Sequence, residues 1–388
     1  MFHWKRFIVR TLSYVLVAAV SAFAAIMLWG GSGYSKLSEL EWVINNRFVG
    51  QADMEQARDA AAEAMVDALG DRWSYYVSAE DYAAYKENKD NAYVGVGITI
   101  TEREDETGFD IVEVTPGGSA HEQGVLPGDI LTEADGQPVA EMTTSQVRDI
   151  VRGKEGTKIS IGVLRNGEAL QFTLERKTIR VAVAKGQMLE GGIGLVRIEN
   201  FNTNCASETI AAAKDLLAQG AEKLIFDVRN NPGGYVNEMT KVLDYLLPEG
   251  VLFRQEDNNG KTSQIDSDES CLEVPMAVLV NGSSYSAAEF FAAALREYDW
   301  ATVVGQPTVG KGYYQNTIKL SDGSAVNLST GKYFTPKGVN LTEAGGLTPD
   351  VEVLVDEETA AHIASQTLPV AEDPQIQAAI EALSKNAE

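Results

Sequence analysis

The stretch that decides the fold is Asn281-Gly-Ser-Ser-Tyr-Ser-Ala-Ala-Glu289, which separates an apolar run from a run of helix-forming residues. The run before it, Met276–Val280, is short and wholly apolar, as expected of a buried strand, and Ala287–Leu295 favours a helix. Ser286 is therefore predicted at a strand-to-helix turn, where a short side chain and nearby backbone N–H groups point toward one place. This position makes Ser286 a candidate nucleophile.

Lys311, in the stretch Val309-Gly-Lys-Gly-Tyr-Tyr-Gln315, is the candidate base for this serine. A serine hydroxyl reacts readily only when a neighbouring base removes its proton, and a lysine accepts that proton only when it is neutral. Since only about one lysine in a few thousand is neutral at pH 7 at its usual pKa, the site must bury Lys311 away from carboxylates. The alternative is a serine-rich helix N-cap beside an ordinary surface lysine.

A second strand-to-helix turn can supply backbone donors. The run Lys223–Arg229 is predicted as a strand, Asn230-Asn-Pro-Gly-Gly234 as a turn and Val236–Leu247 as a helix. Two glycines at the N-terminus of a helix can expose N–H groups toward a developing oxyanion. By itself, a pair of glycines is usually only a turn.

These segments together resemble the carboxy-terminal processing proteases, also called tail-specific proteases. The family pattern is Asp-x-Arg-x-Asn-Pro-Gly-Gly after a strand, then Ser-Ala-Ser-Ala-Ser-Glu, then Gly-x-x-Thr-x-Gly-Lys-Gly-x-x-Gln. The chain carries corresponding segments at Asp227–Gly234, Ser284–Glu289 and Gly305–Gln315. The resemblance covers most of residues 40–385, because it continues through Asp71–Tyr76, Lys332–Gly338 and Gly345–Asp350.

The resemblance implies a role for each site residue. It makes Ser286 the nucleophile, Lys311 the base and Gln315 the residue that orients the lysine. The oxyanion donors would be the backbone N–H groups of Gly233 or Gly234 and of Ala287. No cofactor is implied.

The serine segment departs from the family pattern at two positions. Tyr285 stands where alanine is usual, and Ala288 replaces the third serine. Ser283, Ser284 and Ser286 therefore all have to be considered as the nucleophile. The spacing to the lysine and the following Ala-Ala-Glu favour Ser286.

The few histidines and cysteines argue against other chemistries. The histidines are His3, His121 and His362, and none is placed to serve the Ser-His-Asp triad of a chymotrypsin-like protease. With just two cysteines the chain has no zinc-type ligand cluster, so no metal site is expected. Cys205 and Cys271 can pair in an oxidising compartment or remain free thiols, and the sequence leaves both open.

Residues 91–178 change to short strands and turns and resemble a PDZ domain. Its carboxylate-binding loop is predicted to consist of Gly95, Val96, Gly97 and Ile98. The N–H groups of such a loop can hold a C-terminal carboxylate beside an open strand edge, and the helix Ser145–Val151 would form the other wall of the groove. Arg152, at the end of that helix, can couple the PDZ position to the active site, as the resemblance implies, or simply complement the helix dipole.

Thr11–Ser35 is an uncharged segment that is apolar through Trp29 and follows three basic residues. Its length suffices to cross a bilayer, so it is predicted as a membrane anchor, with a signal peptide cleaved near Ser21–Ala25 as the alternative. The basic residues before it, and Glu39 and Glu41 after it, place the N-terminus in the cytoplasm. The predicted location is the cell membrane, with a single pass and an extracytoplasmic body.

The formal net charge of −24 disfavours nucleic acid and anionic membrane surfaces as partners, because both would repel the chain. The expected partners are protein or peptide substrates with free C-termini, and the membrane through the N-terminal helix. A second copy of the chain is a further candidate partner, since the resemblance implies that the N-terminal helices can mediate dimerisation.

The predicted architecture is a mixed α/β serine protease core with an inserted PDZ domain and an N-terminal transmembrane helix. The predicted ranges are a cytoplasmic stub and anchor at 1–34, a helical region at 35–90, the PDZ domain at 91–178, the catalytic domain at 179–355 and a helical tail at 356–388. The predicted function is peptide-bond cleavage by a Ser-Lys dyad through an acyl-enzyme. The alternative is a non-catalytic PDZ scaffold on a decayed protease body, against which the retention of Ser286, Lys311 and Gln315 argues.

Overall fold

The computed structural model describes residues 14, 16–17, 20–21, 36–103, 105 and 107–385. The chain divides into two compact units, Met1–Gly70 and Asp71–Glu388. Most of the predicted anchor, Thr11–Ser35, lies outside the described residues. Among the residues that are described, no helix is long and apolar enough to cross a membrane.

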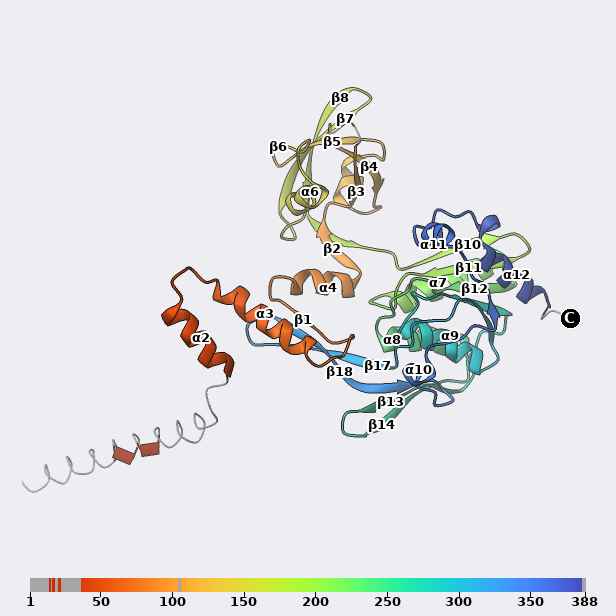
Figure 1. Cartoon of the computed structure of the whole chain (residues 1–388). Coiled ribbons are helices and arrows are strands. Elements are labelled where there is room, and N and C mark those ends of the chain that lie inside the picture. The colour runs from red at the N-terminus through yellow and green to blue at the C-terminus, as the bar shows by residue number, and fades with distance from the viewer. Residues whose placement is uncertain are drawn as a thin grey trace, which may run out of the picture. The chain divides into compact units, whose positions relative to one another are not determined.

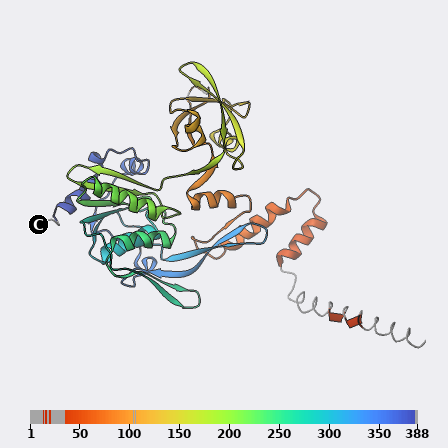
Figure 2. The same cartoon turned by 180° about the vertical axis from the view of Figure 1, so that it is seen from behind.

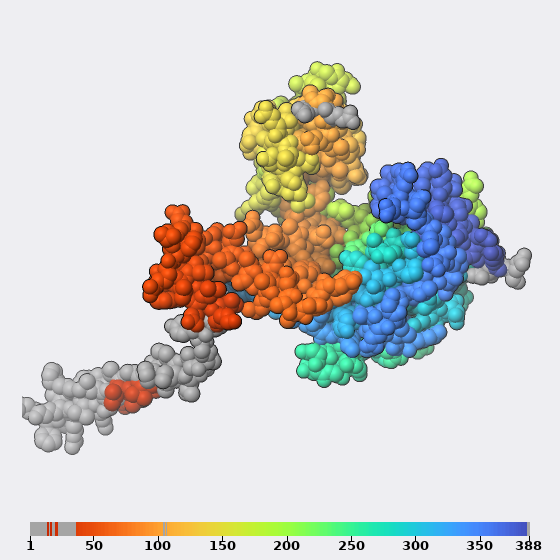
Figure 3. Space-filling model, viewed as in Figure 1, coloured from red at the N-terminus to blue at the C-terminus, as the bar shows by residue number. Residues whose placement is uncertain are grey.

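The first unit contains α2 (Lys36–Arg47) and α3 (Met54–Asp67). Asp53 caps α3, because its carboxylate accepts from the N–H groups of Glu55 and Gln56 at 3.0 Å. Neither helix buries a residue, and their side chains form the orange-red surface in Figure 3. The predicted helical character of this region is therefore present in the structure.

The core of the second unit is a six-stranded sheet with helices on both faces (Figure 1). Its strands, in order across the sheet, are β10 (Ala184–Leu189), β11 (Ile193–Ile198), β12 (Lys223–Asp227), β15 (Met276–Val280), β16 (Ala301–Gly305) and β19 (Val351–Glu352). All neighbouring pairs are parallel except β10 and β11. The helices of one face are α7 (Cys205–Ala218), α8 (Val236–Leu246) and α9 (Ala287–Glu297), and α12 (Pro374–Lys385) covers the other.

The burial of β15 explains why its sequence is a continuous apolar run. Met276, Val278 and Val280 belong to the core cluster shared with α7, α8 and α9. Ala277 and Leu279 belong to the cluster shared with α12. A parallel strand covered on both faces has no side that can accept polar residues. The predicted buried strand and the helix after it are thus confirmed. Ser286 lies in the turn that follows the carboxyl end of β15.

A second, antiparallel sheet forms another part of the pocket described below. Its strands are β1 (Tyr75–Val77), β18 (Ala325–Phe334), β13 (Gly250–Asp257), β14 (Thr262–Ser267) and β17 (Tyr313–Lys319). Strands β17 and β18 pair over most of their length, and from behind they appear as two long blue strands side by side (Figure 2). This pairing brings residues near Lys311 and residues near Phe334 into the same sheet.

A third sheet has a separate hydrophobic core. It is formed by β3 (Ile98–Glu102), β4 (Phe109–Val114), β5 (Ile130–Ala134), β6 (Gln137–Pro138), β7 (Lys158–Arg165) and β8 (Glu168–Glu175). Two helices accompany it, α5 (Ser119–Gln123) and α6 (Thr144–Val151). The paired strands β2 (Ala92–Gly95) and β9 (Lys177–Arg180) stand at its entry and exit.

The remaining helices of this unit are α4 (Tyr82–Asp90), α10 (Leu341–Ala344), α11 (Glu357–Ala364) and the 3₁₀ helix η1 (Val370–Glu372). The mixed α/β class predicted from the sequence is therefore confirmed. The predicted domain ranges stay predictions.

Candidate active site

Ser286 occupies the turn between β15 and α9 in a conformation that is rare for a residue other than glycine. Its φ is +59° and its ψ is −127°. L-residues seldom adopt a positive φ, because the Cβ then crowds the backbone, and such strain is typical of functional sites. Ser286 is 7% exposed, and it lines a pocket of about 1090 Å³.

The other serines considered as nucleophiles are placed differently. Ser284 is fully buried, and its hydroxyl donates to the Val228 carbonyl oxygen at 2.7 Å. Ser283 is exposed in the turn, and its N–H donates to Asn281 Oδ1 at 3.0 Å. Neither lines the pocket, so the geometry favours Ser286 among the three candidates.

Glu289 ties the serine turn to the lysine loop. Its fully buried carboxylate accepts hydrogen bonds from the backbone N–H groups of Ser286 at 2.9 Å, Gly310 at 2.7 Å and Lys311 at 2.8 Å, and also from the Thr308 hydroxyl. Burial raises the pKa of Glu289, and these donors oppose the rise. Sequence reasoning missed Glu289 as a residue of the site, although Ser286-x-x-Glu289 has the spacing of a capping box.

Lys311 is half-buried and lies against aromatic rings. Its Nζ lies 4.6 Å from the centroid of the Trp73 ring and 5.8 Å from that of Tyr285. These two rings stack on each other at 5.6 Å, so the tyrosine that departs from the family pattern forms part of the wall around the lysine. Sequence reasoning missed Trp73, although it lies within the Asp71–Tyr76 segment that carries part of the resemblance.

The environment of Lys311 favours its neutral form. Burial lowers the pKa of Lys311 to about 8, and the nearby charges of Lys89 and Arg72 act in the same direction. Asp71 and Glu289 oppose the shift, but Lys311 forms no ion pair with any described residue. The requirement set by the sequence is met in part: Lys311 is half-buried without an ion-pair partner, but the carboxylates of Asp71 and Glu289 lie near enough to act on its pKa.

Hydrogen bonds from α10 hold the loop that carries Lys311. The Asn340 side-chain amide donates to the carbonyl oxygens of Gly312 at 3.0 Å and Tyr333 at 3.1 Å. The Thr342 hydroxyl accepts from the Gly312 N–H at 2.7 Å and donates to the Gly310 carbonyl at 2.9 Å. These bonds fix the backbone of the loop.

The Ser286 hydroxyl lies 2.6 Å from the Tyr333 hydroxyl. Tyr333 is 3% exposed, and its ring packs against Phe290 at 4.4 Å and Phe253 at 5.4 Å between centroids. Burial raises the pKa of Tyr333, so its hydroxyl stays protonated and can act as a donor. Among the described contacts, no hydrogen bond joins Ser286 to Lys311. Sequence reasoning missed Tyr333, which lies 47 positions away in the chain.

The backbone N–H groups considered as oxyanion donors differ in whether they already donate a hydrogen bond within the protein. Gly233 has φ +85°, and a Cβ there would stand 2.7 Å from the Cβ of Ser286, so only glycine fits at this distance. Its N–H already donates to Asn231 Oδ1 at 2.8 Å. The N–H groups of Gly234 and Ala287 have no hydrogen-bond partner within the described part of the chain. The geometry therefore favours Gly234 and Ala287 over Gly233 as donors.

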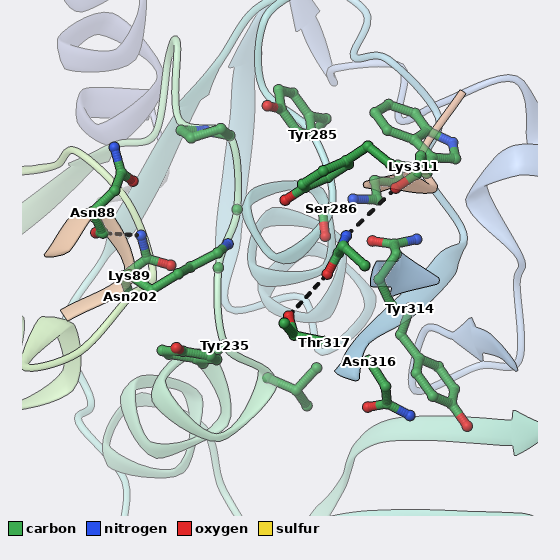
Figure 4. A pocket seen from close by; sticks show the side chains of 18 of the residues that line it. Asn88, Lys89, Asn202, Tyr235, Tyr285, Ser286, Lys311, Tyr314, Asn316 and Thr317 are labelled. Atoms are coloured by element: carbon green, nitrogen blue, oxygen red, sulfur yellow. Dashed lines mark hydrogen bonds between the residues drawn. The ribbon is translucent and has the colours of Figure 1, made fainter. Parts of the chain in front are cut away.

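Gln315 lines the same pocket as Ser286 and Lys311. Its side-chain amide donates to the Tyr313 carbonyl at 3.1 Å and to the Ser329 hydroxyl at 3.0 Å. No described hydrogen bond joins it to Lys311, so its orienting role stays a prediction. Figure 4 shows the pocket with Ser286 near its centre and with Lys311 and Lys89 on different sides.

The predicted carboxylate-binding loop spans the end of β2 and the start of β3. The Val96 carbonyl accepts from the Ala120 N–H at 3.0 Å, and the Gly97 carbonyl accepts from the Thr115 N–H at 2.9 Å. Gly95 ends β2, and Ile98 begins β3. A role of this loop in binding peptides stays a prediction.

Arg152 connects α6 to α4 and β2. Its guanidinium donates to the Glu87 carboxylate at 3.0 Å and lies 4.7 Å from the centroid of the Tyr93 ring. Both contacts lie beyond the helix that Arg152 caps, so it does more than complement a helix dipole. Its predicted regulatory role is not tested by these contacts.

The remaining expectations concern metals and thiols. No cluster of three or more metal-ligating side chains occurs among the described residues. Cys205 is buried, Cys271 is partly exposed, and both are free thiols in this structure.

Comparison with known proteins adds to this geometry. Residues 192–353, which include the serine, lysine and glycine turns, match the model of "Peptidase family S41", and residues 111–165 match that of the PDZ domain. The segment that carries the candidate serine and lysine is therefore similar to peptidase family S41. The resemblance to the carboxy-terminal processing proteases with a PDZ domain is thus confirmed as a similarity.

The similar proteins include several that are named CtpA-like serine proteases. The one from Staphylococcus aureus (strain COL) is 28% identical over 328 residues, which cover 83% of this chain and 65% of the relative. The one from Staphylococcus epidermidis (strain ATCC 12228 / FDA PCI 1200) is 27% identical over 361 residues, which cover 89% of this chain and 73% of the relative. The chain thus spans less than two thirds of the length of the Staphylococcus aureus relative.

A crystal structure from Bacteroides fragilis NCTC 9343, described as an S41 protease, shares the fold. It superposes with a TM-score of 0.51 at 16% identity and covers 92% of this chain and 99% of its own.

Proposed function

We propose that the protein is a serine endopeptidase in which Ser286 is the nucleophile and Lys311 the general base. One observation carries the proposal: the strained serine and a half-buried lysine, whose pKa is lowered to about 8, line the same pocket. Few structural roles would require both a serine at positive φ and a lysine that lies against aromatic rings without an ion-pair partner.

The proposed reaction begins when the Lys311 side chain rotates from the Trp73 ring toward Ser286. Neutral Lys311 takes the proton of the hydroxyl, and the Ser286 oxygen attacks the peptide carbonyl carbon. The N–H groups of Gly234 and Ala287 stabilise the oxyanion of the tetrahedral intermediate. The lysine ammonium then protonates the leaving amine as the C–N bond breaks, which leaves an acyl ester on Ser286.

Hydrolysis of the ester repeats these steps with water. Lys311 takes a proton from the water, the resulting hydroxide attacks the ester carbonyl, and the Ser286 oxygen leaves with the proton that Lys311 returns. Tyr333 would donate its hydroxyl proton to the serine oxygen in the resting state. This bond leaves the serine's own proton free to point toward the incoming lysine.

The pH dependence of cleavage tests this proposal. Because the neutral form of Lys311 is the active one and its pKa is lowered to about 8, kcat/KM should rise roughly 50-fold between pH 6 and pH 8 and level off above pH 9. A fluorogenic peptide series measured from pH 5.5 to 10.5 provides the profile. A profile that is flat across this range, or that still rises steeply above pH 10, contradicts a buried lysine base. The alternative, a non-catalytic PDZ scaffold, predicts no cleavage at any pH.

We propose that the PDZ domain captures the C-terminus of the substrate through the loop of Gly95, Val96, Gly97 and Ile98. Peptides that end in an apolar residue should be cleaved about 10-fold better with a free than with an amidated C-terminus, because amidation removes the charge that the loop would bind. Paired rates on the two forms of one peptide measure this. Equal rates would remove the capture role and leave the catalytic proposal intact.

We further propose that Thr11–Ser35 anchors the protein in the cell membrane with the body outside and that a homodimer can form. The sequence pattern alone supports the anchor, through the uncharged length and the flanking charges. Membrane fractionation and protease shaving of spheroplasts test it. A body protected from the added protease, or a mature N-terminus found just after Ala25, would overturn the anchor.

A further inference from the structure

Lys89, on α4, is a second lysine that lines the pocket. Figure 4 shows its side chain extending into the pocket beside Tyr235 and Asn202, and in that view Ser286 lies between Lys89 and Lys311. Its Nζ lies 5.8 Å from the centroid of the Tyr85 ring and 6.0 Å from that of Tyr235. The ammonium group therefore faces aromatic rings and open space.

No carboxylate pairs with Lys89 in the part of the chain that the structure describes. Asp81, the one acidic residue among the described pocket-lining residues, accepts a hydrogen bond from the Ser78 hydroxyl at 2.7 Å. Burial lowers the pKa of Lys89, and no acidic group offsets this shift. A lysine held in a pocket without a partner is stabilised when a ligand brings the missing negative charge.

The charge of the pocket is opposite to that of the whole chain. The sequence has 56 acidic and 32 basic residues, whereas the described pocket lining has the basic residues Arg72, Lys89 and Lys311 and the single acid Asp81. Arg72 stacks on Trp73, with its guanidinium carbon 4.1 Å from the ring centroid. A concave site of one sign concentrates ligands of the other sign, even in a protein of the same charge as the ligand.

We propose that Lys89 forms an anion subsite that binds a carboxylate group of the substrate peptide close to the scissile bond. This inference rests on the proposed peptidase function and adds a chemical class of substrate to it. The carboxylate can come from an aspartate or glutamate side chain, or from the end of a peptide cut near its C-terminus. Figure 4 shows Lys89 and Lys311 on different sides of Ser286, so a carboxylate can pair with Lys89 without forming an ion pair with Lys311.

Binding is measured on the Ser286→Ala protein, so that no peptide is cleaved. Fluorescence anisotropy compares labelled peptides that differ only by glutamate or glutamine, with the residue moved along the sequence. We expect the glutamate form to bind at least about 10-fold more tightly at one position, because a carboxylate and an ammonium group attract each other more strongly in a partly buried pocket than in bulk water. Adding Lys89→Met should bring the ratio near one, and adding Lys89→Glu should invert it. Lys86→Met, an exposed lysine of the same helix, is the matched control and should retain the preference.

Amidated peptides distinguish the two sources of the carboxylate. A loss of binding on amidation that disappears in the Lys89→Met background assigns the terminal carboxylate to Lys89. A loss that persists in that background belongs to the PDZ loop. Thermal melting of each variant shows whether the substitution alters folding.

Cleavage by the protein with Ser286 intact gives a second readout. The kcat/KM ratio for matched glutamate and glutamine peptides should fall from at least about 10 toward one in Lys89→Met. Both peptides are cleaved by the same variant, so any effect of Lys89 on the pKa of Lys311 changes both kcat/KM values equally and leaves their ratio unchanged. Equal binding of all matched pairs, or a preference unchanged by Lys89→Met and Lys89→Glu, overturns the subsite. If no peptide is cleaved but the Lys89-dependent preference is seen in binding, the peptidase proposal fails and the subsite stands.

Discussion

Replacing Ser286 by alanine should lower peptide hydrolysis by about 10⁴-fold or more, because the hydroxyl that forms the acyl-enzyme has no substitute in the pocket. The fold should survive, since the alanine keeps the Cβ and the backbone bonds to Glu289 that hold the turn. Steady-state cleavage of an unfolded protein with a free C-terminus, together with thermal melting, measures both effects.

Ser284→Ala is the matched control for this experiment. Its hydroxyl bonds to the buried carbonyl of Val228, so its loss should destabilise the protein by roughly 1–3 kcal/mol while cleavage by the folded fraction continues. Ser283→Ala, in the exposed part of the turn, should change neither property. Normal cleavage by Ser286→Ala and loss of cleavage in a folded Ser284→Ala protein would show that the nucleophile has been assigned to the wrong serine.

Lys311→Arg should be as inactive as Lys311→Met, with a loss of about 10³-fold or more in kcat/KM. Arginine keeps the positive charge but stays protonated at any accessible pH, so it cannot accept the serine proton. The arginine variant should also lose the rise in activity between pH 6 and pH 8 that neutral Lys311 produces in the parent protein. Single-turnover rates at pH 7 and pH 9 provide the measurement.

Lys337→Arg, at an exposed lysine, is the control for the substitution itself and should leave the rate unchanged. Appreciable turnover by Lys311→Arg would exclude Lys311 as the base and would direct attention to Tyr333, whose hydroxyl lies 2.6 Å from that of Ser286. The comparison with Lys311→Met shows whether the charge alone contributes to the binding of substrate.

Local features of the site could be predicted because they depend on neighbours in the chain. The apolar run Met276–Val280 and the helix formers after Ser286 specify a strand, a turn and a helix, and the structure has β15 and α9 at these positions. The strand-glycine-helix pattern around Gly233 and Gly234 was confirmed for the same reason, with β12 and α8 on either side.

Contacts between distant segments were not predictable in this way. Three serines in one turn have similar propensities, and only packing shows that Ser284 faces the Val228 carbonyl while Ser286 faces the pocket. Tyr333 reaches Ser286 because β18 is part of another sheet, and hydrogen-bond partners of this kind leave no periodic signal in the sequence.

The sequence by itself determined the strand-to-helix turns, the candidate serine and lysine, and the need for that lysine to be buried, because these follow from local propensity and from the chemistry of single side chains. Tertiary structure decided what surrounds them. The rings of Trp73 and Tyr285 lie against Lys311, and the Glu289 carboxylate accepts hydrogen bonds from both the serine turn and the lysine loop. Lys89 lines the pocket without a carboxylate partner among the described residues. Burial and charge proximity arise only when segments far apart in the chain pack together, so the lowered pKa of Lys311 to about 8 is a property of the fold.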